Sequence, residues 1–257
     1  MTPATAARSR YAGVLSILSY NRHYYTASLC ALLSIGAILW LRLLPRAGAA
    51  LLIAAAALTV FLSLSSLVAS WYIYDHAQVT RWSWLPRTLS FPPRQWLNIH
   101  AGLDESTSAL IRFFPNTAHE VFDIYDAREM TEPSIARARQ SHPAAQPAIE
   151  ARLDALPLPD GDRDTVFLLF AAHEIRSPAR RRQFFAEAAR VLASPGQLLL
   201  VEHLRDWKNF VAFGPGFLHF HSRREWLRVA HAAGLVVVRE DRVTPFVRVF
   251  LLARGGA

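Results

Sequence analysis

The stretch that decides the fold reads Gln95-Trp-Leu-Asn-Ile-His-Ala-Gly-Leu-Asp-Glu-Ser-Thr-Ser-Ala-Leu-Ile-Arg112. A short apolar run leads into a tight turn at Gly102, and a helical pattern follows. Because glycine has no Cβ, the backbone of this turn can approach a ligand closely, and Ser106 or Thr107 can cap the helix. The stretch therefore predicts a strand, a turn and a helix, the first unit of an α/β domain that binds a nucleotide.

The composition indicates a single domain of ordinary size with an apolar appendage. The 257 residues are 52% hydrophobic and 19% charged, and most of the acids follow Asp104. The net charge is +8, but the one basic run, Arg180–Arg182, is short and has no interleaved aromatic residues. We therefore expect no nucleic-acid partner and favour attraction to an anionic membrane surface. The single cysteine, Cys30, excludes an intramolecular disulfide.

Two long apolar runs precede the α/β domain. Residues 1–25 are polar, aromatic and basic, and the apolar runs cover residues 26–44 and 49–74. Each run reaches the roughly 20 residues that span a bilayer. We predict a transmembrane hairpin over residues 26–75, a linker over 76–94 and the α/β domain over 95–257. The alternative is a helical hairpin buried in a soluble core.

The arginines predict the orientation of this hairpin. Arg8, Arg10 and Arg22 precede it, and Arg81, Arg87 and Arg94 follow it, whereas only Arg42 and Arg46 lie between the two runs. Positive charge concentrates on the cytoplasmic side of membrane proteins. Both termini and the α/β domain are therefore expected in the cytoplasm, with two helices in the membrane.

After the first strand, apolar runs typical of strands alternate with helical stretches. Strands are expected at residues 96–100, 120–125, 165–170 and 197–202, and helices at 106–114, 134–139, 179–192 and 223–233. Residues 194–196 read as a turn, and residues 235–239 and 246–252 as a closing antiparallel hairpin. This alternation predicts a doubly wound, mostly parallel sheet with helices on both faces and an antiparallel last strand.

Several motifs follow one another in the second half of the chain. They read Asp154-Ala-Leu-Pro-Leu-Pro-Asp160, Ala171-Ala-His-Glu-Ile-Arg176, Phe185-Ala-Glu-Ala-Ala-Arg-Val-Leu192 and Ser194-Pro-Gly-Gln-Leu-Leu-Leu-Val-Glu202. In this order and with these gaps, residues 96–254 resemble a class I S-adenosylmethionine-dependent methyltransferase with a type 11-like domain. The resemblance implies a Rossmann-like fold, S-adenosylmethionine as cofactor and a methyl acceptor as substrate.

The resemblance also implies a cofactor site in the first turn. The family has an acidic-x-Gly-x-Gly-x-Gly pattern there, whereas this chain has Asn98-Ile-His100-Ala101-Gly102-Leu-Asp104 and retains one of the three glycines. Asp104 or Glu105 could balance the cationic charge of the cofactor, or could instead cap the following helix. We predict that His100 and Asp104 act as a pair that replaces the missing glycines.

Two further positions complete the implied cofactor site. Asp126 is expected to end the second strand, where the family keeps an acid for the ribose hydroxyls, and Asp123 is the second choice. Asp154 and Ala155 match the segment that meets the adenine. For each acid the alternative is a solvated loop residue.

Candidate catalytic and substrate-binding residues follow the next strands. His173 and Glu174 are expected at the carboxyl edge of the sheet, where ligands bind in open α/β folds, and His173 can serve as a general base. Substrate-binding candidates are Glu202, His203, Phe217 and His219. His203, His219, His221 and Glu202 are also metal-ligand types, but their spacing is unspecific, and we predict no metal.

The aromatic insertion at residues 204–225 favours a lipophilic acceptor such as a quinone, a polyprenyl or an acyl lipid, although ordinary loop packing explains it equally well. Two hypotheses remain open. The first is a membrane-anchored methyltransferase, and the second is a methyltransferase-like, non-catalytic subunit with a degraded cofactor turn.

Overall fold

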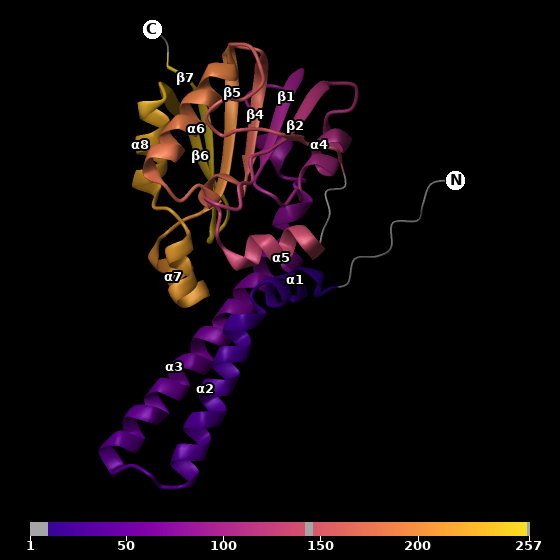
Figure 1. The fold of residues 1–257 in the computed structure, drawn as a ribbon. Coiled ribbons are helices and arrows are strands. Elements are labelled where there is room, and N and C mark those ends of the chain that lie inside the picture. The colour runs from indigo at the N-terminus through magenta and orange to yellow at the C-terminus, as the bar shows by residue number, and fades with distance from the viewer. Residues whose placement is uncertain (1–9, 142–145, 256–257) are drawn as a thin grey trace. The chain divides into compact units, whose positions relative to one another are not determined.

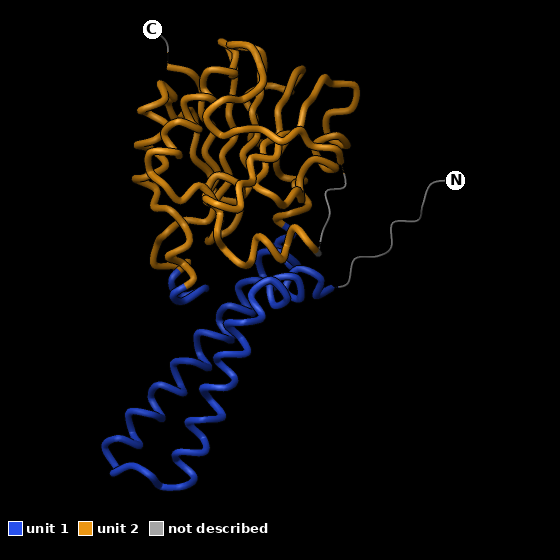
Figure 2. The backbone as a smooth tube through the Cα atoms, in the orientation of Figure 1, with its two compact units in different colours: residues 1–78, 210–215 blue, residues 79–209, 216–257 orange. Residues whose placement is uncertain are grey.

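The computed structural model describes residues 10–141 and 146–255, and the chain divides into two compact units. Unit 1 comprises residues 1–78 and 210–215, and unit 2 comprises residues 79–209 and 216–257 (Figure 2).

Unit 1 is built mainly from three helices. These are α1 (Ala12–Tyr20), α2 (Arg22–Trp40) and α3 (Arg46–Ser70), and a π-helical turn, η1 (Trp71–His76), follows α3. The long helices α2 and α3 run side by side (Figure 1), and the Tyr25 hydroxyl lies 3.0 Å from Ser66 Oγ. The Asp75 carboxylate accepts the backbone N–H groups of Gly13 and Val14 at 2.7 and 2.9 Å, so it caps the start of α1.

The two apolar runs form helices, but both begin earlier than predicted. Helix α2 starts at Arg22 and ends at Trp40, because Arg42 adopts a left-handed φ of 52° that cannot continue an α-helix. Helix α3 starts directly after Pro45. By length and composition, the described residues contain two segments able to cross a membrane, and none of their apolar windows is buried. Helix α1, within the predicted polar segment, was missed.

Unit 2 contains one seven-stranded sheet in the order β3-β2-β1-β4-β5-β7-β6. The strands are β1 (Gln95–His100), β2 (Ala118–Asp123), β3 (Ile149–Glu150), β4 (Arg163–Leu169), β5 (Leu192–His203), β6 (Leu235–Thr244) and β7 (Val247–Arg254). Strand β7 is antiparallel to both of its neighbours, and the pairings among β1 to β5 are parallel. The predicted α/β class and the antiparallel last strand are confirmed.

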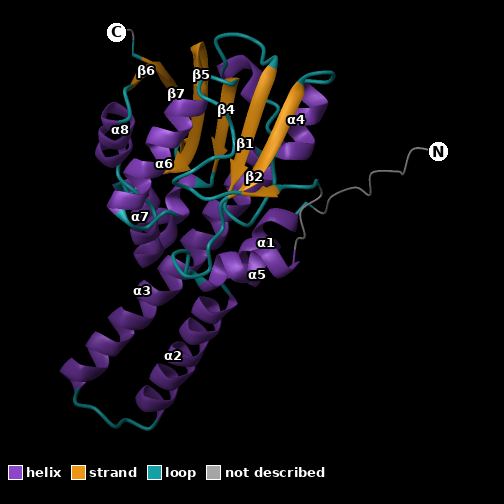
Figure 3. Ribbon diagram, turned by 45° about the horizontal axis from the view of Figure 1, so that its top comes forward, coloured by secondary structure: helices purple, strands orange, loops and turns teal. Residues whose placement is uncertain are grey.

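Helices connect these strands (Figure 3). They are α4 (Thr107–Phe113), α5 (Pro133–Ser141), α6 (Pro178–Val191), α7 (Trp207–Phe213) and α8 (Arg223–Ala232). Short 3₁₀ turns are η2 (Val79–Arg81), η3 (Leu85–Thr88), η4 (Ala172–Glu174) and η5 (Gly214–His219). The Ser177 and Ser222 side chains cap α6 and α8 by accepting N–H groups of their first turns.

Alternating side chains of each strand supply two apolar faces. Leu97 of β1 belongs to the core that includes Phe184 of α6 and Trp226 of α8. Trp96, its neighbour in the sequence, points to the other face, where its ring lies 5.9 Å from that of Phe167. Both faces of the sheet therefore carry buried apolar side chains. Ligands in open α/β folds bind at the carboxyl ends of the parallel strands.

Several boundaries differ from the sequence-based expectation, and three of them bear on the site or on the division into units. Strand β2 ends at Asp123 rather than at residue 125. The prediction ran too far because Ile124, which lies after the strand, is also buried and extends the apolar pattern. Residues 194–196 form no separate turn, since β5 runs through them with a register shift against β4. Residues 79–94, expected as a linker, belong to unit 2.

Candidate functional site

The turn after β1 is organised by Gly102 and Asp123. Parallel pairing places His100 opposite Asp123 at the carboxyl ends of β1 and β2. Gly102 donates its N–H to Asp123 Oδ1 at 2.9 Å, and Tyr125 donates to the same oxygen at 3.0 Å. Gly102 has a left-handed φ of 87°, and a Cβ there would lie 3.1 Å from the Tyr125 ring. Only glycine fits this position without strain.

His100 is buried next to this turn. Its Nδ1 lies 3.6 Å from Asp123 Oδ1, and neither ring nitrogen has a hydrogen-bond partner among the described residues. Burial lowers the pKa of His100, although the nearby Asp123 opposes the shift. A buried polar ring without partners is unfavourable by itself, so His100 is suited to a hydrogen bond with a bound ligand. Ala101, the next residue, is also buried.

Asp104 caps helix α4, which was the alternative to a role in balancing the charge of the cofactor. Its Oδ1 accepts the N–H groups of Ser106 and Thr107 at 3.0 and 2.9 Å, at the start of α4. His100 lies beside Asp123, and Asp104 acts on it only through its charge, which favours the protonated imidazole. The predicted cooperation of His100 and Asp104 in cofactor binding stays a prediction.

The Asn98 side chain is also engaged at the start of α4, and its amide is not free to contact a cofactor. Its amide donates to Ser106 Oγ at 2.9 Å and to Thr107 Oγ1 at 2.7 Å, while its Oδ1 is buried without a partner among the described residues. The amide therefore fixes the helix start against β1.

The acid at the end of β2 is Asp123, not Asp126. Asp126 is exposed, and its Oδ1 accepts the N–H of Arg128 at 2.8 Å in the loop that follows. Asp123 also forms an ion pair with Arg139 of α5, whose guanidinium lies 4.8 Å from the centre of the Tyr125 ring. The position that the family resemblance links to the ribose therefore falls on Asp123, with Arg139 beside it.

Asp154 and Ala155 lie in the loop after β3. Asp154 is paired with Arg152 at 3.1 Å and with Arg180 at 2.8 Å, and hydrogen bonds from these arginines hold its pKa well below the usual range. Ala155 is exposed. The carboxylate that was expected near the adenine is thus engaged by two cations.

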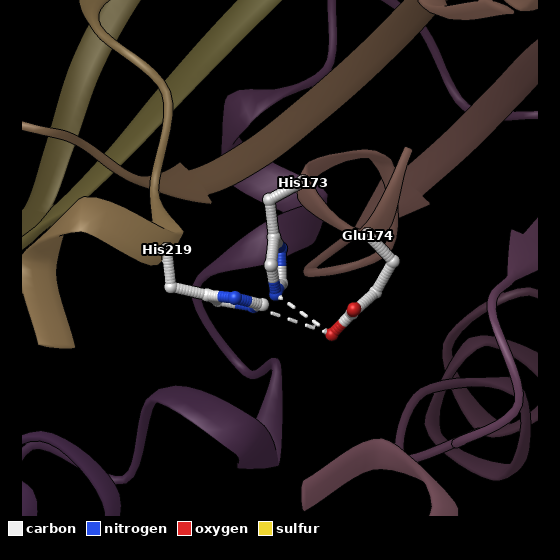
Figure 4. A group of neighbouring side chains, drawn as sticks. All are labelled: His173, Glu174 and His219. Atoms are coloured by element: carbon white, nitrogen blue, oxygen red, sulfur yellow. Dashed lines mark ion pairs between the residues drawn. The ribbon is translucent and has the colours of Figure 1, made fainter. Parts of the chain in front are cut away.

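A second cluster forms where β4 and β5 end (Figure 4). His173 and Glu174 lie on η4, directly after β4, and their facing atoms, Nε2 and Oε1, are 3.3 Å apart. Glu202 of β5 is fully buried. It accepts the backbone N–H of His173 at 3.1 Å, and its Oε2 lies 2.7 Å from His173 Nδ1. His219 of η5 completes the cluster, with Nε2 at 3.5 Å from Glu174 Oε1.

The carboxylates determine the charge of His173. Burial disfavours its charged form, but Glu202 and Glu174 outweigh burial and raise the pKa of His173 to about 10. Burial also disfavours the charged form of Glu174, which would raise its pKa. Hydrogen bonds from His173 and His219 outweigh burial, and the net shift of the Glu174 pKa is downward. At neutral pH His173 therefore donates from both ring nitrogens, which does not suit the general base that the sequence predicted.

The other predicted substrate-binding residues surround this cluster. His203 is buried, with Nδ1 at 3.0 Å from the carbonyl of Phe246, and burial lowers its pKa to about 4. Its ring stacks on Phe170 and Phe220 at centroid distances of 5.2 and 4.9 Å. Phe217 of η5 is half-buried. His203 thus contributes to an aromatic wall.

Three residues of these surroundings were missed in the sequence. Glu132 lies 3.5 Å from His219 Nδ1, and Arg176 donates to the carbonyl of His219. Arg181 is buried and bonds to His221 and Glu225. Their partners are 40 or more residues away, so no local pattern could identify them. Arg181 lies in the first turn of α6, within the run Arg180–Arg182, and that run was the one available signal.

Comparisons with known proteins agree with this architecture. Residues 108–200 match the family model described as "Methyltransferase domain". No curated protein matches the chain.

Two solved structures share the fold. The PH0226 protein from Pyrococcus horikoshii OT3 is 15% identical, with 70% of this chain and 91% of that chain covered and a TM-score of 0.52. The pyocyanin biosynthetic protein PhzM is 16% identical, with 72% and 57% covered and a TM-score of 0.50.

Proposed function

We propose that this chain, whose second unit has a class I methyltransferase fold, is a membrane-anchored S-adenosylmethionine-dependent methyltransferase acting on a lipophilic small molecule. The match over residues 108–200 and the shared fold support the methyltransferase activity and the cofactor. The observation that carries the lipophilic acceptor is the insertion after β5, because it combines exposed apolar side chains with the site residue His219.

The turn after β1 fits the cofactor. Gly102 gives the turn its left-handed backbone and lets Tyr125 pack against it, and His100 offers buried ring nitrogens without partners among the described residues. His100, Gly102 and Asp123 would hold the cofactor, with the Asp123 carboxylate accepting hydrogen bonds from hydroxyl groups. When bound, S-adenosylmethionine supplies a methyl group activated by a sulfonium.

The acceptor would lie against the second cluster. Glu174 Oε2 is buried without a hydrogen-bond partner among the described residues, so it can accept a hydrogen bond from an acceptor hydroxyl. His173 holds the Glu174 carboxylate in place through its other oxygen. Methyl transfer depends mainly on alignment of the reacting atoms, and this arrangement assigns Glu174 and His173 to positioning the acceptor.

The insertion offers an apolar approach to this cluster. Leu218 directly precedes His219 and is 54% exposed, and Trp207 at the start of the insertion is 71% exposed. Apolar side chains exposed beside a site are typical of surfaces that bind membranes or lipophilic ligands. Quinones, polyprenyls and acyl lipids fit this surface, and two apolar helices in the same chain support delivery from a membrane.

Leu218→Ser should raise the apparent KM for the lipophilic acceptor roughly 10- to 150-fold, since losing the burial of a leucine costs about 1.5–3 kcal/mol. The full chain in detergent is first given a membrane lipid extract and methyl-labelled S-adenosylmethionine, and label should enter the organic phase. The KM for S-adenosylmethionine should not change. Val238→Ser is the matched control, because Val238 on the edge strand β6 is 56% exposed. Label found only in water-soluble products would exclude a lipophilic acceptor.

A reporter fused after Ala257 should give a cytoplasmic signal. The reason is the excess of arginines on both flanks of the apolar hairpin over the two between its helices. Paired fusions of alkaline phosphatase and a fluorescent protein, each with and without residues 22–76, would measure the orientation. Phosphatase activity outside the cytoplasm would contradict it.

The ion pair between Arg139 and Asp123 favours one alternative, a non-catalytic membrane-bound subunit whose cofactor turn has closed. Calorimetry with S-adenosylmethionine distinguishes the methyltransferase from the non-catalytic subunit. Binding in the micromolar range supports the enzyme, and no binding supports the subunit.

A further inference from the structure

We propose that His173, Glu174 and His219 form a binding site for a divalent transition-metal ion, with Glu202 orienting His173. The ion site stands independently of the methyltransferase assignment. Only its use as an anchor for an oxygen atom of the acceptor rests on the proposed function.

The three ligand atoms already have suitable spacing. Glu174 Oε1 lies 3.3 Å from His173 Nε2 and 3.5 Å from His219 Nε2, and the ligand atoms of the three residues all lie within 4.8 Å of one another. Two ligands bonded to one zinc ion at about 2.1 Å in a tetrahedral arrangement are roughly 3.4 Å apart. Figure 4 shows both imidazoles directed at the same carboxylate.

A buried carboxylate fixes the orientation of His173. Glu202 contacts both the backbone N–H and the Nδ1 of His173, at 3.1 and 2.7 Å, and is itself fully buried. This leaves His173 Nε2 directed toward Glu174, where a bound ion would replace the proton that Nε2 carries in the ion-free site. Metal-binding histidines are commonly held in this way, with the second ring nitrogen donating to a carboxylate.

The charges and the unused atoms also favour a cation. Glu174 and Glu202 place two carboxylates in a buried region, and Glu174 Oε2 has no hydrogen-bond partner among the described residues. A buried acceptor without a partner is unfavourable, so Oε2 remains available to the ion or to an acceptor bound beside it. Two imidazoles and one carboxylate form a donor set typical of zinc and iron(II) sites that keep open coordination positions. An oxygen of the methyl acceptor can occupy such a position.

This ligand set differs from the residues considered in the sequence analysis, which included His203 and His221. His203 is directed at the carbonyl of Phe246, and His221 lies 2.9 Å from the Arg181 guanidinium. Neither imidazole belongs to the cluster that meets at Glu174. The competing explanation is a purely hydrogen-bonded His–Glu–His bridge, which needs no ion.

The test uses the full chain in detergent, stripped with a chelator and then titrated with Zn²⁺ by calorimetry and with Co²⁺ by visible absorption. We expect one ion per chain and the intense visible bands of low-symmetry cobalt. Glu174→Gln and His219→Asn should each weaken Zn²⁺ binding by about 100-fold or more, and Glu202→Gln by about 10- to 100-fold. The control is His231→Ala, an exposed histidine on α8, which should bind as the parent does.

Two results would overturn the site: no stoichiometric ion in the folded parent, or equal affinity in Glu174→Gln, His219→Asn and the parent. His219 is partly exposed, so its variant tests the site even if Glu174→Gln does not fold. Binding of S-adenosylmethionine is measured on the same samples. Cofactor binding without zinc binding rejects only the metal site, and zinc binding without cofactor binding rejects only the proposed function.

Discussion

Arg181→Met should lower the free energy of unfolding by about 3–5 kcal/mol, the usual effect of removing one partner of a buried ion pair. Arg181 is 2% exposed, and its Nε and Nη2 lie 3.2 and 2.7 Å from Glu225 Oε1. Its Nη1 donates to the carbonyl of Ile175 and to His221 Nε2. Methionine fills similar space but removes the donor to Glu225 Oε1, to the Ile175 carbonyl and to His221, while Arg228 still pairs with Glu225 Oε2.

Urea unfolding of the full chain in detergent, followed by tryptophan fluorescence, measures this effect. Arg182→Met is the matched control, because the neighbouring arginine on α6 is exposed, and it should change stability by less than about 0.5 kcal/mol. The double variant Arg181→Met/Glu225→Gln should recover part of the loss, since the buried carboxylate is then neutral. A loss below 1 kcal/mol in Arg181→Met would show that the guanidinium is dispensable.

Asp123→Asn should weaken S-adenosylmethionine binding roughly 10- to 150-fold, the equivalent of about 1.5–3 kcal/mol for hydrogen bonds to a charged group. Asparagine keeps the oxygen that accepts the N–H groups of Gly102 and Tyr125. It removes the negative charge available to the ribose hydroxyls and also the partner of Arg139, so thermal unfolding of the cofactor-free variant is measured beside its affinity.

Asp126→Asn is the control for this experiment, because Asp126 is exposed in the loop after β2 and serves only its own turn in the described contacts. Calorimetry on both variants should show a loss in Asp123→Asn alone. The reverse pattern would restore the assignment that the sequence first suggested, and equal affinities in both would remove both acids from the site.

The sequence predicted the sheet well because its signals are local. Each strand except β3 carries its own apolar run, and Gly234 ends α8 before the closing hairpin. Strand β3 is only two exposed residues long and was not predicted. The end of β2 was misplaced because burial of Ile124 continues after the strand pairing stops. The apolar pattern reports burial, and only hydrogen bonding defines the strand.

The site was predictable in position but not in detail. Parallel strands bring their carboxyl ends to one edge, so His173 and Glu202 could be expected near each other. Their direct contact spans 29 residues, and the one from Arg176 to His219 spans 43. Which atoms pair depends on register and loop packing, and these pairings decide whether His173 is a base or a proton donor.

The packing of residues 79–94 determines where the α/β unit can be joined to another protein segment. Trp82 donates its indole N–H to the carbonyl of Glu105, Leu85 is fully buried, and Gln197 donates to the carbonyl of Phe91. The segment before the first strand is therefore part of the folded α/β unit. A gene fusion that joins this unit to another N-terminal segment must carry the chain from Val79 onward, since a junction at Gln95 would uncover apolar surface and leave buried polar groups unpaired.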